Sequence, residues 1–274
     1  MAARWRLAAS LCLASCLFDA QAPAANETDF VEALRARGLD RLAELRCRER
    51  LADEGLPPRA AAGFAIQLSL IEVDRALAAR EGQETHWSRA RDALRASTSG
   101  RESADAWLLL SLQQGLNRAT RGEFQQAVGD PAAVATLRDA SRLLASTKRK
   151  IEDALRAGGR ELSGRQVSAR ELEALASRGD LAQARVERLL ALCHPAGSAD
   201  RDDALLQALQ LATDVAGRNL SAELVWRARL LVVSSERLLG AAPRGLERLN
   251  ASGWRTPPAP PGMAGAVAAE RWRL

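Results

Sequence analysis

The stretch LLALCHPAGSADRDDALLQAL, residues 189–209, contains an apolar run, a short break and a second apolar run. Pro195 and Gly197 lie in the break, and both residue types commonly mark the ends of helices. Ser198 or Asp200 follows and can cap a new helix by accepting a hydrogen bond from one of its first backbone amides. The stretch therefore predicts two helices joined by a tight bend, which is a helical hairpin.

The same stretch contains residues that could carry chemistry. Cys193 and His194 could act as nucleophile and base, or could bind a metal together with nearby aspartates, Asp200 and Asp202. Adjacent residues on a helix point about 100° apart, so Cys193 and His194 do not share a face. Cys193 instead continues the apolar face of the first helix, and His194 lies in its last turn, where a cation suits the helix dipole. We therefore expect a bend and no catalytic or metal site.

The composition favours helices along the whole chain. Of the 274 residues, 47% are hydrophobic but only 4% are aromatic, and tyrosine is absent. Alanine, leucine, arginine and glutamate are abundant, and these side chains lose little freedom in a helix. The alternation of Val, Ile and Thr that is typical of strands is almost absent. The sequence therefore predicts an all-α protein.

Amphipathic segments joined by short links rich in Gly or Pro follow one another along the chain. Short links make successive helices antiparallel neighbours. The expected helices span residues 30–38, 39–55, 60–80, 85–97, 102–122, 123–159 with a break at 129–131, 168–179, 180–193, 198–218, 220–240 and 243–249. Residues 168–179 and 180–193 are expected to pair as one hairpin. The series predicts antiparallel helical hairpins stacked as an irregular α-solenoid.

A spacing of five residues links a glycine to a second small residue at four places. The pairs are Gly38 and Ala43, Gly122 and Ala127, Gly179 and Ala184, and Gly240 and Gly245. We expect each first glycine at a hairpin turn, and each second residue where its small size lets two helices approach closely. Tetratricopeptide repeats use this arrangement, although the pairs here do not follow the repeat period of about 34 residues.

Three stretches resemble the exported tetratricopeptide-repeat-like proteins of planctomycete bacteria. They are DFVEALRARGLDRLAELRCRERLAD at residues 29–53, ALCHPAGSADRDDALLQAL at 191–209 and WRARLLVVSSERLLG at 226–240. The resemblance implies a solenoid of helical hairpins that acts as a scaffold or binds a partner, and it supplies no catalytic residues. The chain departs from that family at its end, where the family's proteins usually continue through many more repeats.

The first 22 residues are expected to be an export signal, because Arg4 and Arg6 precede an apolar run too short to span a bilayer. Residues 20–22, AQA, form a site for ordinary signal peptidase. Residues 13–16, LASC, resemble a bacterial lipobox, in which Cys16 would be acylated and would tether the protein to a membrane. We expect export to the periplasm, the cell envelope or the medium, with membrane attachment only if Cys16 is acylated.

Charge and motif content argue against several classes of function. The formal net charge is +5, but the arginines alternate with acids, as on solvated helix faces, so we expect no nucleic-acid partner. Cys47 and Cys193 lie far apart in the chain and are expected to remain unpaired as small buried residues. His86 is expected to be half-exposed. Without a CxxC, HExxH or Gly-rich phosphate motif, we expect no catalytic residue, metal or cofactor.

The sequence predicts three segments: a signal peptide at 1–22, a helical-repeat domain at 23–251 and a disordered tail rich in Pro and Ala at 252–274. Residues 222–240 form a helix that is apolar on much of its circumference and must be covered on more than one side. The tail could fold back over it, but its proline pairs cannot continue a helix. We expect instead that missing repeats, a partner or self-association cover this open end.

Taken together, these features predict an exported, non-catalytic helical-repeat scaffold that binds a protein or peptide partner. The alternative is a structural or envelope-assembly component that is tethered to a membrane through Cys16.

Overall fold

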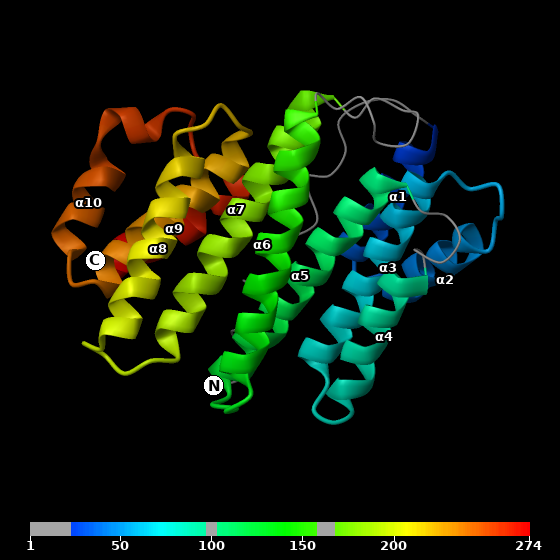
Figure 1. Ribbon diagram of the computed structural model, residues 1–274, viewed down its shortest axis with the longest axis horizontal. Helices are drawn as coiled ribbons and strands as arrows, with labels where there is room; N and C mark the ends of the chain where they lie inside the picture. Colours follow the sequence, from blue (N-terminus) through cyan, green and yellow to red (C-terminus); the bar gives the residue numbers. More distant parts are fainter. Residues whose placement is uncertain (1–22, 97–102, 158–167) are drawn as a thin grey trace. The chain divides into compact units, whose positions relative to one another are not determined.

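The computed structural model describes residues 23–96, 103–157 and 168–274, and across these residues it contains helices and no strands (Figure 1). The helices are α1 (Pro23–Ala36), α2 (Asp40–Leu51), α3 (Pro58–Ala78), α4 (Gln83–Ala96), α5 (Ala104–Ala127), α6 (Ala133–Arg156), α7 (Ala169–Leu192), α8 (Ala199–Ala216), α9 (Ala222–Leu238), α10 (Ala242–Asn250), η3 (Ser252–Arg255), η4 (Pro261–Met263) and α11 (Ala264–Arg273). The predicted all-α class is confirmed. The expected export signal and Cys16 lie outside the described residues.

The chain forms two compact units, Met1–Asn117 and Arg118–Leu274, and the division between them falls within α5. In unit 1, α3 packs against α1, α2 and α4. Small and apolar side chains surround most of α3, so it is stable only with neighbours on several sides. Phe64 and Ile71 of α3 pack with α1 and α2, whereas Val73 packs with Trp87 of α4.

Unit 2 consists of helices that pack in the order of the sequence. α6 packs against α7, α7 against α8, α8 against α9 and α9 against α10. Figure 1 shows that the chain reverses direction between α7, α8 and α9. Fully buried leucines hold these helices together, among them Leu137 of α6, Leu189 of α7 and Leu205 of α8. The prediction that neighbouring helices pack consecutively is therefore confirmed in this unit.

The bend predicted within residues 189–209 is present. α7 ends at Leu192, and Gly197 takes the left-handed conformation with φ of 78°. The Ser198 hydroxyl accepts a hydrogen bond from the backbone N–H of Arg201 at 3.4 Å and caps α8. Local residue chemistry therefore determines where this hairpin turns.

The glycine pairs divide into two groups. Gly38 and Gly240 have positive φ and lie at the turns before α2 and α10, as expected. Their partners Ala43 and Gly245 are buried at the following helix. Gly122 and Gly179 lie inside helices instead, so their assignment to hairpin turns is wrong. Ala184 is buried within α7, and Ala127 is the last residue of α5.

The hairpin expected at residues 168–193 is the single helix α7. A glycine inside a helix costs only about 1 kcal/mol relative to alanine, and the strong helix formers around Gly179 outweigh that cost. Gly122 shows a second reason for a helical glycine: a Cβ placed there would lie 2.6 Å from Cγ of Leu137. The absence of a side chain thus lets α6 approach α5 closely.

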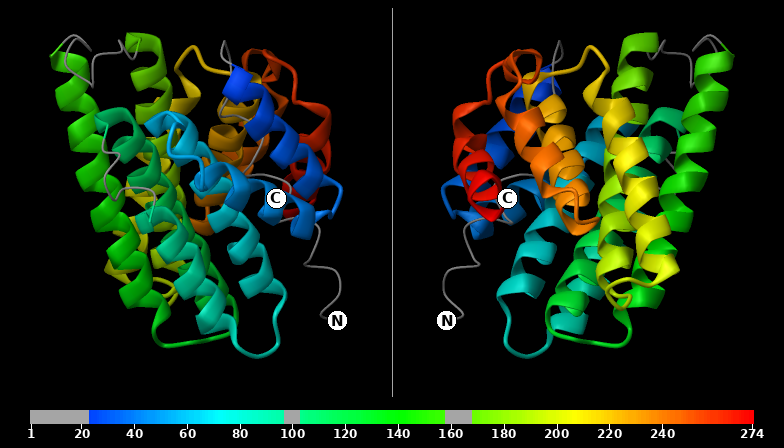
Figure 2. Two further views of the ribbon diagram at one scale, coloured as in Figure 1. Left: turned by 90° about the vertical axis from the view of Figure 1, so that its right-hand side faces the viewer. Right: turned by 90° about the vertical axis from the view of Figure 1, so that its left-hand side faces the viewer.

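The expectation of a disordered tail is also wrong, because residues 252–274 fold back onto α9. Met263 and Val267 join Trp226, Val233 and Leu249 in one apolar cluster, and Leu274 packs against it. Contact between α11 and α9 is seen also in the side views (Figure 2). α10 ends at Asn250, before the first proline pair, and Pro261 opens η4. The chain beyond the prolines still carries enough apolar side chains to cover α9.

Arg229 of α9 fixes the start of this returning segment. Its guanidinium donates to the backbone oxygen of Trp254 at 2.6 Å and to that of Thr256 at 2.8 Å. The Trp226 indole donates to the backbone oxygen of Pro257 at 2.8 Å. The extended, proline-rich backbone has carbonyls without helical partners, and α9 supplies the donors that they need. The open end on which we based self-association is therefore covered by the chain's own tail.

In the part of the chain that the structure describes, no helix combines the length and the apolar character needed to cross a lipid bilayer.

Candidate functional site

The predicted bend begins with Cys193, the first residue after α7. Cys193 is half-buried, and its thiol donates a weak hydrogen bond to the backbone oxygen of Leu189 at 3.4 Å. Burial raises the pKa of the Cys193 thiol, which disfavours the nucleophilic thiolate. Within the described ranges, no group of three or more His, Cys, Asp and Glu residues is placed to hold a metal ion.

Cys47 lies in the core between α1, α2 and α3, with no exposed surface. Burial raises the pKa of its thiol to about 12, although the charge of Arg35 acts in the opposite direction. Cys47 and Cys193 are both free thiols, as the sequence predicts.

A buried acid in unit 1 was not singled out from the sequence. Glu72 of α3 is only 3% exposed and accepts from Arg75 at 2.6 Å and from His86 of α4 at 2.7 Å. Arg75 also reaches Glu44 of α2 at 2.5 Å, and this hydrogen bond lowers the pKa of Glu44. His86 is half-exposed, as expected, but it partners a buried carboxylate. The group neutralises Glu72 and ties α2, α3 and α4 together.

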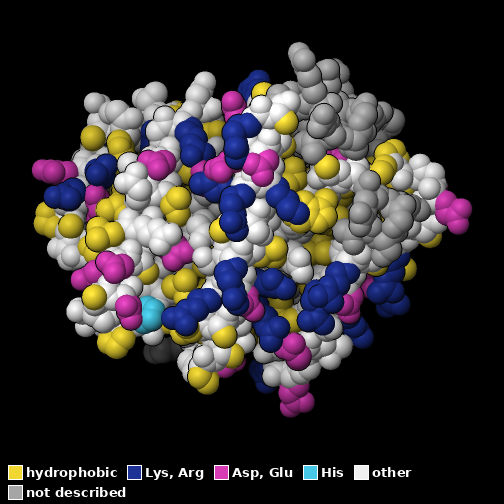
Figure 3. Space-filling model, in the orientation of Figure 1, with side chains coloured by type: hydrophobic (Ala, Val, Ile, Leu, Met, Phe, Trp, Pro, Cys, Tyr) yellow, Lys and Arg dark blue, Asp and Glu magenta, His cyan; other side chains and the backbone are white. Residues whose placement is uncertain are grey.

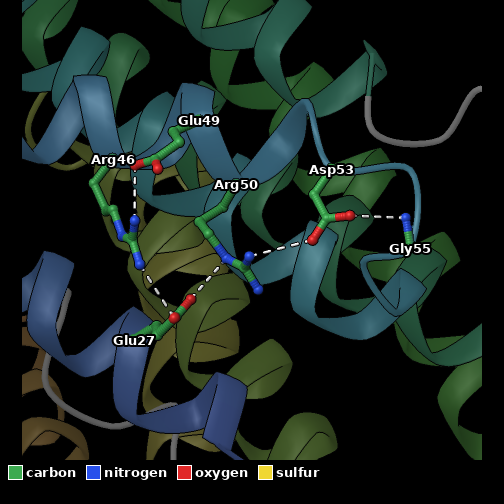
Figure 4. A network of polar contacts seen from close by, with 6 residues as sticks. All are labelled: Glu27, Arg46, Glu49, Arg50, Asp53 and Gly55. Atoms are coloured by element: carbon green, nitrogen blue, oxygen red, sulfur yellow. Dashed lines mark hydrogen bonds and ion pairs between the residues drawn. The ribbon is translucent and has the colours of Figure 1, made fainter.

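A second network connects α1 with α2 and the turn that follows (Figure 4). Glu27 of α1 accepts a hydrogen bond from Arg46 at 3.2 Å and forms an ion pair with Arg50 at 2.7 Å. Arg50 also reaches Asp53 at 3.2 Å, and Asp53 accepts from the backbone N–H of Gly55 at 3.0 Å. These side chains are partly exposed, so each pair contributes only about 0–1 kcal/mol. We assign this network a structural role.

A buried acid in unit 2 is fully neutralised. Asp180 of α7 is 3% exposed and lies 2.5 Å from Lys148 of α6 and 2.7 Å from Arg218 of the turn after α8. Arg218 also donates to the hydroxyl of Ser177 at 3.0 Å. Asp180 therefore links α6, α7 and the turn after α8.

A second group of charged residues in unit 2 contains more arginines than carboxylates. We call it the Arg188 cluster; it consists of Glu123 of α5, Arg185 and Arg188 of α7, Arg237 of α9 and Glu270 of α11. Arg185 forms an ion pair with Glu123, and Arg237 forms one with Glu270 at 2.9 Å. Two of the three arginines thus have a carboxylate, and Arg188 does not.

Arg188 is the least satisfied cation of this cluster. Its Nε is enclosed and lacks a hydrogen-bond partner, and in the described part of the chain its terminal nitrogens make no hydrogen bond or ion pair. Burial lowers the pKa of Arg188, the charges of Arg185 and Arg237 lower it further, and Glu123 and Glu270 oppose them. The guanidinium nevertheless remains charged, because arginine does not lose its proton in proteins.

Sequence reasoning missed the Arg188 cluster because its residues come from four separate helices. One signal was present: Arg185 and Arg188 are three residues apart, so they share a face of a helix. Acidic side chains lie among the basic ones over the face shown in Figure 3, so charge counting along the chain does not distinguish paired from unpaired arginines.

Comparisons with protein-family models, with curated proteins and with solved structures find no match to this chain.

Proposed function

We propose that this protein is an exported, non-catalytic helical scaffold that binds a protein or peptide partner, with hairpins arranged in a tetratricopeptide-like solenoid. The observation that carries the proposal is the serial packing of α6, α7, α8, α9 and α10, each against the next. Helices stacked in this way form an extended surface from many short elements, and repeat proteins use such surfaces for binding.

The glycine pairs support the tetratricopeptide-like part of the proposal at two places. Gly38 and Gly240 turn the chain into α2 and α10, and Gly245 lies 3.2 Å from Val233 of α9 when a Cβ is built on it. Gly122 and Gly179 depart from that arrangement, because they lie within long helices. We therefore propose an irregular array rather than a regular repeat.

The Arg188 cluster supports a binding role for unit 2. Its side chains come from α5, α7, α9 and α11, so a segment that contacts them would meet several helices of unit 2. Arg188 is half-buried and its Nε lacks a hydrogen-bond partner, so an acceptor on a partner would add a contact that the chain itself does not supply.

Affinity capture from the cell-envelope fraction of the source organism tests this function, with the purified protein as bait. We expect one or a few partners that bind saturably in a second, purified assay and that crosslink to α5, α7 or α9. A heat-denatured bait is the control. Partners that bind both baits equally, or the absence of any saturable partner, would contradict the proposal.

A second candidate role is that of a membrane-tethered structural or envelope-assembly component. The observation that favours it is the sequence LASC at residues 13–16, which resembles a lipobox. An acyl group on Cys16 would hold the protein at a membrane surface. Fractionation of cells that express the protein or its Cys16→Ser variant tests this role: release of the variant alone from the membrane fraction would support it.

A further inference from the structure

Two buried side chains of α9 bind the backbone of the returning tail. Arg229 donates to the backbone oxygen of Trp254 at 2.6 Å and to that of Thr256 at 2.8 Å. The Trp226 indole donates to the backbone oxygen of Pro257 at 2.8 Å. Backbone oxygens inside a helix are already bonded to amides of the helix, so donors arranged in this way suit an extended segment. This face of α9 therefore recognises a backbone conformation.

Arg229 serves the tail and not the packing of the helices. Its side chain is 6% exposed, and in the described part of the chain its hydrogen bonds go to backbone oxygens of the tail. No carboxylate in this part of the chain pairs with it. A buried guanidinium without acceptors carries a large desolvation cost. The α9 face thus depends on a bound segment to satisfy its charged donor.

One aromatic side chain sets the register of the bound segment. The Trp254 ring packs against an apolar cluster that contains the small residue Ala184 of α7. The guanidinium carbons of Arg229 and Arg248 lie 5.7 Å and 5.4 Å from the centroid of this ring, at distances where a cation is attracted to an aromatic face. The next side chain, that of Arg255, is exposed. The site therefore takes an aromatic side chain and leaves the following one in solvent.

Proline suits the rest of the segment. Residues 257–261 are PPAPP, and Pro260 has φ of −57° and ψ of 147°, close to polyproline II. Thr256 is extended as well, with φ of −112° and ψ of 122°. Polyproline II keeps its backbone oxygens free of internal hydrogen bonds, and proline-rich segments lose little entropy when they dock in aromatic-lined grooves.

We propose that this face of α9 is a binding site for an extended peptide with an aromatic residue before its prolines, and that residues 254–260 are its intramolecular occupant. The inference rests on the proposed binding function and names the class of ligand. The occupant is joined to α10 through exposed residues, Ala251, Ser252 and Gly253. A segment tethered in this way competes at an effective concentration on the order of millimolar, so the free protein is autoinhibited.

Fluorescence anisotropy with the labelled peptide SGWRTPPAPPG, residues 252–262, tests the site. The receptors are the purified protein and its Trp254→Ala variant, which weakens the resident segment and keeps Trp226 and Arg229. We expect the peptide to bind the variant about tenfold more tightly than the parent protein, because the competing tail loses its aromatic anchor.

Changes in the peptide test the same contacts without altering the receptor. On the Trp254→Ala protein, a peptide with Trp254→Ala should bind about tenfold more weakly, and one with both Pro257→Ala and Pro258→Ala about threefold more weakly. A peptide with Arg255→Ala is the matched control and should bind with unchanged affinity, because this side chain is exposed. An excess of the parent peptide should also speed proteolysis of the tail in the parent protein, since displacement exposes it.

Equal affinity of the two proteins for the parent peptide would overturn the proposal, because the tail would then not occupy the peptide's site. Equal affinity of the parent and Trp254→Ala peptides would overturn it too, as would the absence of binding to either protein. Affinity capture of a partner that crosslinks to helices other than α9, while the peptide fails to bind, would keep the scaffold function and reject this site.

Discussion

At the scale of single residues, Gly122 and Gly179 look alike in the sequence but differ in their surroundings. Both lie inside long helices and both are followed by alanine five residues later. A Cβ on Gly122 would come within 2.6 Å of the buried Leu137, whereas a Cβ on Gly179 would meet nothing within 4 Å. Only the first glycine is therefore required by packing.

We expect Gly122→Ala to lower the free energy of unfolding by about 1–2 kcal/mol, because the overpacking cost exceeds the gain in helix propensity. The matched variant Gly179→Ala should raise it by about 0.5–1 kcal/mol, because the propensity gain is not opposed. Urea unfolding measures both values. Stabilisation by both substitutions would show that α5 and α6 do not approach as closely as described.

Cys47 leads to a pH-dependent prediction. Its pKa rises from 9.0 to about 12 in the folded protein, because burial penalises the thiolate. The unfolded chain therefore loses the proton first, and stability present below pH 9 is lost as the pH rises towards 12. Relative to the Cys47→Ala variant, the free energy of unfolding should fall by about 2–3 kcal/mol between pH 9 and pH 11. Parallel pH profiles of the two proteins would contradict the burial of this thiol.

At the scale of elements, α11 acts as a cover for α9. Val267 is 8% exposed and lies in the cluster with Trp226 and Val233, whereas Trp272 on the same helix is 90% exposed. The amphipathic pattern of α11 thus has one face that packs and one that does not. The expected disorder of residues 252–274 was wrong because we judged this segment by its prolines and small residues, and not by the apolar helix that it could cover.

We expect Val267→Asp to release α11, because a buried carboxylate replaces an apolar contact worth about 2 kcal/mol. Limited proteolysis should then cut within residues 252–274 much faster than in the parent protein. Trp272→Asp changes the same helix on its exposed face and should leave the cleavage rate unchanged. Equal cleavage of all three proteins would mean that the tail is not held against α9.

At the scale of the whole molecule, the sequence carries an expectation about residues 1–22, whereas the structure describes the chain from Pro23 onward. The first 22 residues predict export, and the described helices begin at Pro23. Among the described residues, unit 1 and unit 2 each have their own buried apolar clusters.

We propose that the mature protein starts at or beyond Cys16 and is found outside the cytoplasm. Intact-mass measurement of the exported material determines the starting residue. An added diacylglyceryl mass would select the lipoprotein role, and its loss in Cys16→Ser would confirm the site of attachment. Exported protein that retains Met1–Leu17 would contradict the signal peptide.

The sequence by itself determined the helical class, the bend after Leu192 and the free state of both cysteines. Composition and capping act within a few residues, so they can be recognised from the local sequence. Only the tertiary structure decided that residues 169–192 form one helix and that the tail covers α9. Each of these depends on which distant side chains become neighbours, because burial and charge compensation are set by contacts between elements that the local pattern does not specify.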